Sequence, residues 1–158
     1  MYIIRESLVN FAKKYIGYTS INNANIFNDY YYGHEVLGRL FPWCGTFICY
    51  CLAHIGVQLH YASPKRILRL AQDNNYLTQS PKIGDIFISV LNDTYYHTGI
   101  IIEVSDTSFI SIEGNILLDL HISKVDTIPH SLNDNKRYYF IDMDSLPHIK
   151  KDVIKNCH

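Results

Sequence analysis

The apolar residues of this chain follow a helical period in its first half and alternate as in strands in its second half. Three helices are predicted in the first half, over residues 4–15, over residues 43–55 and from Pro64 onward. Five strands are predicted in the second half, over residues 86–90, 97–104, 107–112, 118–125 and 137–141. Helices followed by antiparallel strands are typical of an α+β fold.

The segment over residues 18–42 lies between the first two predicted helices and is rich in asparagine, tyrosine and glycine. It is predicted to form a long loop or a broken helix. A loop of this length inside one domain is often functional. The tyrosines at positions 30–32 are therefore candidates for a ligand cleft.

The composition is that of a near-neutral globular chain. Its 158 residues are 47% hydrophobic and carry a net charge of −1, which suits one domain with its own core. No basic run is present, so we expect neither a nucleic-acid nor a membrane partner. The first 18 residues hold only short apolar stretches, so we expect synthesis in the cytoplasm without a signal peptide or membrane span.

Four cysteines are present, and three of them fall within eight residues. Cys49 and Cys51 are too close to each other to close a useful loop, so no disulfide framework is expected. A zinc site built from Cys49, Cys51 and His54 is an alternative, but the usual second pair of ligands is missing. The fourth cysteine, Cys157, lies in the C-terminal tail and is expected to form only adventitious disulfides.

Cys44 is the candidate nucleophile, because it is predicted at the first turn of a helix in the run Pro-Trp-Cys-Gly. The unpaired N–H groups at a helix start favour a thiolate and lower the pKa of the thiol. Gly45 removes bulk beside the sulfur, which suits a bound carbonyl group. The alternative is that Cys44 is a small buried core residue, which is common for cysteine.

His97 is the candidate base for this thiol. It opens the apolar run Thr98-Gly-Ile-Ile-Ile at the edge of a predicted buried strand. Gly99 in the same strand allows another segment to approach closely. The alternative is an ordinary packed and hydrogen-bonded histidine, because the chain has eight histidines and composition does not select one.

Glu113 and Asn115 are the candidate partners of His97. They share one face if their strand continues without interruption. A hairpin centred on Ser105 places Glu113 directly opposite His97, whereas a two-residue loop places Gly114 there instead. The alternative for Glu113 is an exposed carboxylate at the end of a strand.

Several segments resemble the CHAP domain, the cysteine- and histidine-dependent amidohydrolase/peptidase family. Its nucleophile helix is similar to PWCGTFICYCLAHIGV, its first core strand to GDIFISV and its opening helix to VNFAKKYIGY. Its histidine strand and the strand after it are similar to YHTGIIIEV and FISIEGN. The resemblance spans about residues 5–141 of a single domain over residues 1–158, with a tail over residues 142–158.

The resemblance implies a papain-like fold with Cys44, His97, Glu113 and Asn115 as catalytic residues and with no metal or cofactor. It also implies that peptidoglycan or its stem peptides are the substrate. Cleavage would be that of an N-acetylmuramoyl-L-alanine amidase or an endopeptidase, acting through an acyl-enzyme. The aromatic residues near the motifs, which are Trp43, Tyr96 and Tyr32, are the candidate substrate-binding residues.

Two biological settings fit a hydrolase of this kind, a phage-type lysin and a secreted antibacterial effector. Either would act at the cell wall or periplasm, after lysis or contact-dependent secretion. A cognate immunity protein is a further candidate partner. Two rival functions remain, a pathogen effector that acts as a protease or deamidase on host proteins, and an inactive binding module. An inactive module is expected to lack at least one of Cys44, His97 and Glu113.

Overall fold

The computed structural model describes residues 2–148 of the chain. The three helices predicted from the apolar period are present, and a short additional helix, α2, lies between the first two. Ser63 caps the last helix by accepting the Arg66 N–H, and Pro64 occupies its first position, as is common for proline. The helices are α1 (Tyr2–Lys13), α2 (Ile26–Tyr32), α3 (Cys44–His54) and α4 (Pro64–Asp73).

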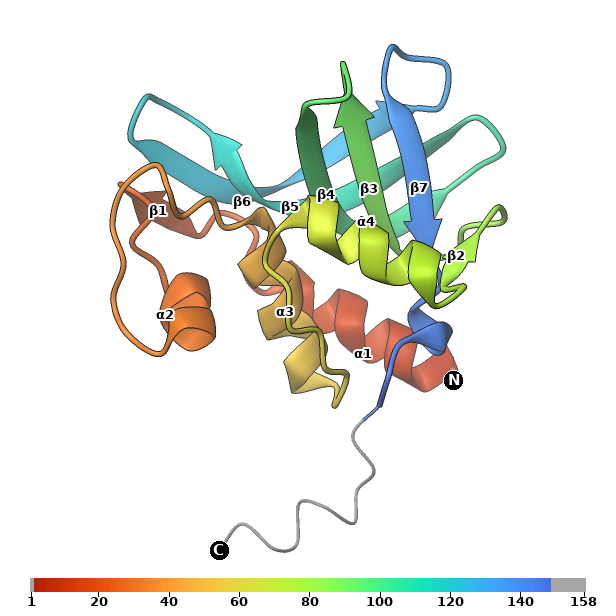
Figure 1. The fold of residues 1–158 in the computed structure, drawn as a ribbon, viewed down its shortest axis with the longest axis horizontal. Coiled ribbons are helices and arrows are strands. Elements are labelled where there is room, and N and C mark those ends of the chain that lie inside the picture. Colours follow the sequence, from red (N-terminus) through yellow and green to blue (C-terminus); the bar gives the residue numbers. More distant parts are fainter. Residues whose placement is uncertain (1, 149–158) are drawn as a thin grey trace, which may run out of the picture.

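All the strands belong to one antiparallel sheet, so the fold is α+β as predicted. The sheet order is β1-β6-β5-β4-β3-β7-β2, and Figure 1 shows α4 crossing in front of β4, β3 and β7. A 3₁₀ helix, η1 (Met143–Ser145), follows the last strand. The strands are β1 (Thr19–Ile21), β2 (Leu77–Thr78), β3 (Ile86–Leu91), β4 (Tyr95–Val104), β5 (Ser108–Leu117), β6 (Ile122–Ser131) and β7 (Arg137–Ile141).

Two predictions of local structure are corrected. The segment predicted as a loop or broken helix contains both β1 and α2, and α2 begins after Asn25, whose side chain caps the helix. The strand predicted over residues 118–125 instead runs from Ile122 to Ser131. Residues 118–121 form the turn before it, because the N–H groups of Leu118 and Asp119 both bond the carbonyl of Ile122.

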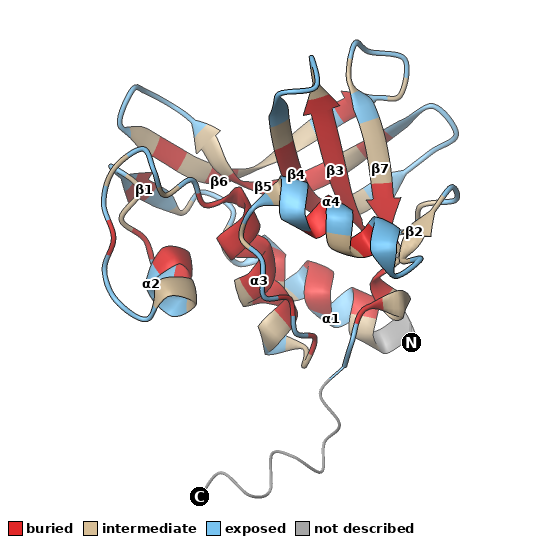
Figure 2. Cartoon of the chain, in the orientation of Figure 1, coloured by how far each residue is buried: buried red, intermediate tan, exposed pale blue. Residues whose placement is uncertain are grey.

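The sheet buries side chains on both of its faces, as the red segments of β3 and β4 in Figure 2 indicate. On the face toward the helices, Ile86, Ile88 and Ile112 pack with Trp43 and Phe47. Phe87 lies between Ile86 and Ile88 in sequence and therefore points to the opposite face. There it packs in a second cluster that consists of Phe87, Ile101, Phe109 and Phe140.

The Gly84-Asp85 pair that precedes β3 connects three parts of the fold. Asp85 is buried, and its Oδ1 lies 2.7 Å from Nη1 of Arg5 on α1. The same oxygen accepts the N–H of Met143, 3.0 Å away, in the segment after β7. Met143 and Leu146 are themselves buried, so the packed part of the chain extends beyond residue 141. Among residues 2–148, no helix has the length and apolar character needed to cross a membrane.

Candidate active site

Cys44 is the first residue of α3, and the start of this helix lies where β4 and β5 separate. Within the described chain, the ladder between the two strands runs only from the Ile100–Ile112 pair to the Val104–Phe109 pair. Beyond it, Gly114 of β5 lies against the helix start. A Cβ atom on Gly114 would be only 2.8 Å from the Cβ of Phe47 and 2.9 Å from the Trp43 ring. This close packing brings Cys44 to the sheet, and the residue is only 5% exposed.

His97 lies on β4 and faces the Cys44 thiol. Burial by itself would lower the pKa of His97. The attraction of the Cys44 charge and a hydrogen bond with Cys44, followed by the interaction with Glu113, outweigh burial and raise this pKa well above its ordinary value. The imidazolium form of His97 is therefore favoured at this position, and a charged imidazole beside a cysteine is the partner with which cysteine nucleophiles are activated.

Glu113 on β5 lies behind His97. Its Oε1 is 2.6 Å from Nε2 of His97, so Nδ1 is the ring nitrogen left for the sulfur. Within the described chain, no hydrogen bond of regular geometry reaches Nε2, and the contact is an ion pair in which the oxygen lies off the N–H direction. Both side chains are buried, with 9% of His97 and 2% of Glu113 exposed.

The register that joins the two residues differs from the predicted one. The pairs Ile100–Ile112 and Ile101–Ser111 place Glu113 across from Gly99 and not across from His97. The hairpin turns later in the chain than predicted, because the Ser105 N–H bonds the Ser108 carbonyl and Val104 pairs with Phe109. A bulge between Ile101 and Glu103 then moves the register back by one residue. Glu113 reaches His97 diagonally, on the same face of the sheet.

Gly99 makes this diagonal contact possible. A Cβ atom at this position would lie 2.6 Å from Cγ of Glu113 and 2.7 Å from the Phe87 ring. The carboxylate side chain therefore occupies the space that a larger residue would fill. The close approach predicted for Gly99 from the sequence is present, and the approaching segment is β5.

Sequence reasoning missed one residue of this site, His130 on β6. Its Nε2 lies 2.6 Å from Oε2 of Glu113, and the Ser111 hydroxyl donates to the same oxygen. Burial tends to raise the pKa of Glu113, but the hydrogen bonds from His130 and Ser111 and the ion pair with His97 outweigh it and lower this pKa to about 2. Glu113 is therefore a carboxylate under all ordinary conditions.

The structure does not bring Asn115 to His97. A bulge in β5 sets two residues, Gly114 and Asn115, opposite the single residue between Lys124 and Asp126 of β6. Asn115 has a left-handed backbone with φ of 62°, and the alternation of the strand shifts by one residue. It therefore leaves the face of Glu113 and lines a hollow of about 190 Å³ together with Arg39 and Pro42.

Of the three predicted substrate-binding aromatics, Trp43 lies in the core, whereas Tyr96 and Tyr32 are half-buried. Trp43 is completely buried, stacks on Phe27 and donates its indole N–H to Ser123, 2.8 Å away, so its side chain does not face a substrate. Tyr96 packs against the core on the helix side, with the Lys65 ammonium over its ring. Tyr32 makes edge-on contacts with the rings of its neighbour Tyr31 and of Phe41.

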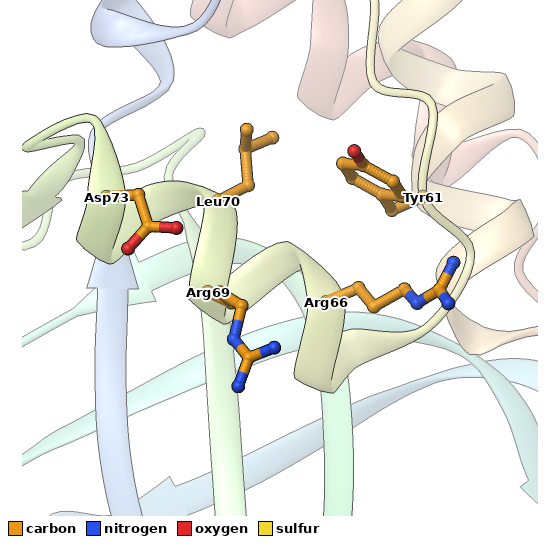
Figure 3. Close-up of a pocket in the computed structure, with 5 residues that line it drawn as sticks. All are labelled: Tyr61, Arg66, Arg69, Leu70 and Asp73. Atoms are coloured by element: carbon orange, nitrogen blue, oxygen red, sulfur yellow. The ribbon is translucent and has the colours of Figure 1, made fainter.

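A second hollow, of about 250 Å³, lies along α4. Figure 3 shows the side chains of Arg66 and Arg69 at its edge, with Tyr61 opposite them. None of Cys44, His97 and Glu113 lines it, so this hollow is separate from the candidate active site.

The other described cysteines do not share the surroundings of Cys44. Burial raises the pKa of Cys49 to about 12 and also raises that of Cys51. The ring of His54 stacks on Phe11, 3.7 Å between centroids, and is not directed at the two sulfurs as a common ligand set. Within residues 2–148, no group of histidine, cysteine and acidic side chains is arranged to hold a metal ion. Cys157 lies outside the described residues.

We predict that Cys44 is alkylated at least about tenfold faster than Cys49 or Cys51 at mildly acidic pH. Iodoacetamide reacts with thiolates, and among the three described cysteines only Cys44 has an imidazolium beside it to balance that charge. Peptide mapping by mass spectrometry after timed labelling measures the three rates, and Cys157 is read from its own peptide. Labelling in denaturant is the control, because it should make the rates similar. Equal rates in the folded protein would contradict an activated Cys44.

We also predict a stability change below pH 5 that depends on Glu113. Its pKa falls from 4.5 in the unfolded chain to about 2 in the folded protein. The carboxylate therefore stabilises the fold above pH 4.5, and this stabilisation is lost as the pH falls toward 2. This difference in the pKa of Glu113 corresponds to about 3 kcal/mol in the free energy of unfolding. Denaturant unfolding between pH 5 and 2 should show a steeper loss for the wild type than for Glu113→Gln, and parallel curves would contradict the ionised carboxylate.

Comparisons with protein-family models, with curated proteins and with solved structures found no match for this chain. The chemistry available to the site follows from its own atoms. A thiol at a helix start faces an imidazole, and a buried carboxylate supports the imidazole from behind. Such an arrangement generates a thiolate nucleophile and stabilises the imidazolium that accompanies it.

Proposed function

We propose that this protein is a cysteine hydrolase of papain-like design that cuts an amide bond of peptidoglycan. The single observation that carries the proposal is the series Cys44, His97 and Glu113. The thiol lies at the start of α3, its hydrogen-bond partner is His97, and His97 contacts a buried carboxylate at 2.6 Å. The three groups come from a helix and two strands that are distant in sequence. Their convergence supports a catalytic role over separate packing roles.

The reaction would begin with transfer of the Cys44 proton to His97, or with the thiolate–imidazolium pair already formed. The sulfur attacks the amide carbonyl, and the N–H of Cys44 at the helix start is available to bind the developing oxyanion. The amine leaves with the proton of His97, which gives a thioester on Cys44. Water then attacks the thioester, with His97 as base, and releases the carboxylic acid. Glu113 stabilises the charged ring throughout.

The substrate assignment rests on the resemblance of the sequence motifs to CHAP domains. The hollow beside the helix start supports an extended ligand, because it is lined by Pro42, which is two residues before Cys44, and by Asn115. Arg39 in the same hollow offers a guanidinium to the carboxylates of stem peptides. In this proposal the protein acts at the cell wall or periplasm, as a secreted antibacterial effector or a phage-type lysin.

Digestion of purified sacculi tests the proposal. Sacculi are incubated with the wild type or with Cys44→Ala, and the soluble products are separated and identified by mass spectrometry. Peptides freed from muramic acid identify an amidase, whereas shortened or uncrosslinked stem peptides identify an endopeptidase. Unchanged muropeptides, from sacculi of several chemotypes, would contradict peptidoglycan as the substrate. Cleavage or deamidation of added proteins in parallel reactions would then support the effector alternative.

A further inference from the structure

The buried carboxylate of Glu113 contacts two histidines, one through each oxygen. Oε1 lies 2.6 Å from His97, and Oε2 lies 2.6 Å from Nε2 of His130 on the neighbouring strand β6. We infer that His130 is a positioning residue of the active site, which holds Glu113 so that Oε1 faces His97. The catalytic meaning of this inference rests on the proposed function, but the geometry it describes does not.

Glu113 needs to be held, because a glutamate side chain has three rotatable bonds and its carboxylate group turns easily. Two donors fix Oε2, which are Nε2 of His130 and the hydroxyl of Ser111. The Ser111 hydroxyl is also 3.2 Å from Nε2 of His130, so the three groups form one closed cluster. With Oε2 fixed in this way, the position of Oε1 beside His97 is determined.

His130 is itself held rigidly by aromatic rings. Its ring stacks on Phe109, with centroids 4.7 Å apart and planes 21° apart, and it lies 4.9 Å from the ring of Phe87. Its Nδ1 is 3.4 Å from the hydroxyl oxygen of Tyr138, which in turn donates to Asp134. His130 is 7% exposed. These contacts aim Nε2 at the carboxylate and keep the ring from turning away.

A histidine that only filled space in this cluster would be replaceable by phenylalanine. Two of the surrounding rings are those of Phe87 and Phe109, and the second core cluster also contains Phe140. The charged group that His130 contacts is the Glu113 carboxylate, through Oε2. Leaving a buried carboxylate oxygen without its charge-assisted donor is unfavourable, and the carboxylate would rotate to find another. The N–H group of His130 therefore serves to hold Oε2 of Glu113 in place.

The alkylation rate of Cys44 tests the inference without any substrate. Misplacing Glu113 weakens the imidazolium of His97 and with it the thiolate, so labelling at mildly acidic pH should fall. We expect about a tenfold decrease for His130→Phe, which corresponds to one pKa unit of the ion pair. His130→Gln places an amide N–H near the same point and should stay within about threefold of the wild type. His54→Phe is the matched control, because it makes the same change in an aromatic stack at the far end of α3.

Two results would overturn the inference. The first is wild-type labelling in His130→Phe, and the second is equal loss in His130→Phe and His130→Gln, which would indicate a structural role only. Nitrogen-15 NMR of histidine in the wild type provides a test that requires no variant to fold, because Nε2 of His130 must carry a proton. An unprotonated Nε2 would also overturn it. If only the proposed function is wrong, the Cys44 labelling rates of the variants will still follow the expected order, but the wild type will leave sacculi intact.

Discussion

Replacing Cys44 with alanine will reduce amide hydrolysis to the background of the assay, a loss on the order of 10⁴-fold or more. Among the described cysteines, Cys44 is the one whose sulfur interacts with His97, and the proposed acyl-enzyme forms on that sulfur. His97→Ala should be almost as inactive, and the double variant little worse, because the two side chains act as one unit. Turbidity loss of purified sacculi and product analysis measure the effect.

The same assay ranks the supporting residues. Glu113→Gln keeps the shape of the side chain but removes the charge that stabilises the imidazolium, so activity should fall substantially without vanishing. Asn115→Ala should lose less, because Asn115 does not contact His97. Cys51→Ala is the matched control for loss of a buried thiol and should keep its activity. Circular dichroism checks that each variant is folded, which matters most for Glu113→Gln because Glu113 is buried. Wild-type digestion by Cys44→Ala would refute the mechanism.

The elements with strong local signals could be predicted from the sequence. The strand over residues 137–141 and the helix at Pro64 have the predicted positions, because turn and capping residues mark their ends. Strands β1 and β2 could not be predicted, since they have three and two residues and exist through pairing with β6 and β7. The bounds of β6 were missed because Pro129 and several polar residues weaken its alternation, so its pairing with β5 determines where it lies.

In the candidate site too, features set by neighbouring residues could be predicted, whereas contacts set by strand pairing could not. The position of Cys44 at a helix start is local and was predicted. The contact of His97 with Glu113 was predicted from a wrong register. The position of the hairpin turn, a bulge in β4 and the glycine at position 99 decide how the two residues meet. His130 could not be found, because it belongs to the part of β6 that lies outside the strand predicted there. One of eight histidines in a chain has no signal until the strand register is known.

The role of Gly45 also differs from the prediction, and it leads to the largest expected effect on folding. The sequence suggested that Gly45 clears space for a bound carbonyl group. Instead, Gly45 is buried, and a Cβ atom on it would lie 1.7 Å from the carbonyl oxygen of Ala62, in the loop between α3 and α4. Two hydrogen bonds fix the loop that contains Ala62. The Tyr31 hydroxyl donates to the carbonyl of His60, and the Cys49 thiol donates to the carbonyl of Tyr61. The backbone of the loop therefore packs directly on the nucleophile helix.

Gly45→Ala should therefore destabilise the protein by about 3 kcal/mol or more, despite the gain of about 1 kcal/mol that alanine normally brings to a helix. The loop or the helix start must shift by more than about 1 Å to restore an ordinary contact distance. A shift of the helix start moves Cys44, so its alkylation should also slow. Gly33→Ala is the matched control. Gly33 has a positive φ of 76° and open space around it, so only backbone strain of about 1 kcal/mol is expected. Denaturant unfolding compares the two variants, and equal losses would mean that crowding at Ala62 does not constrain the helix.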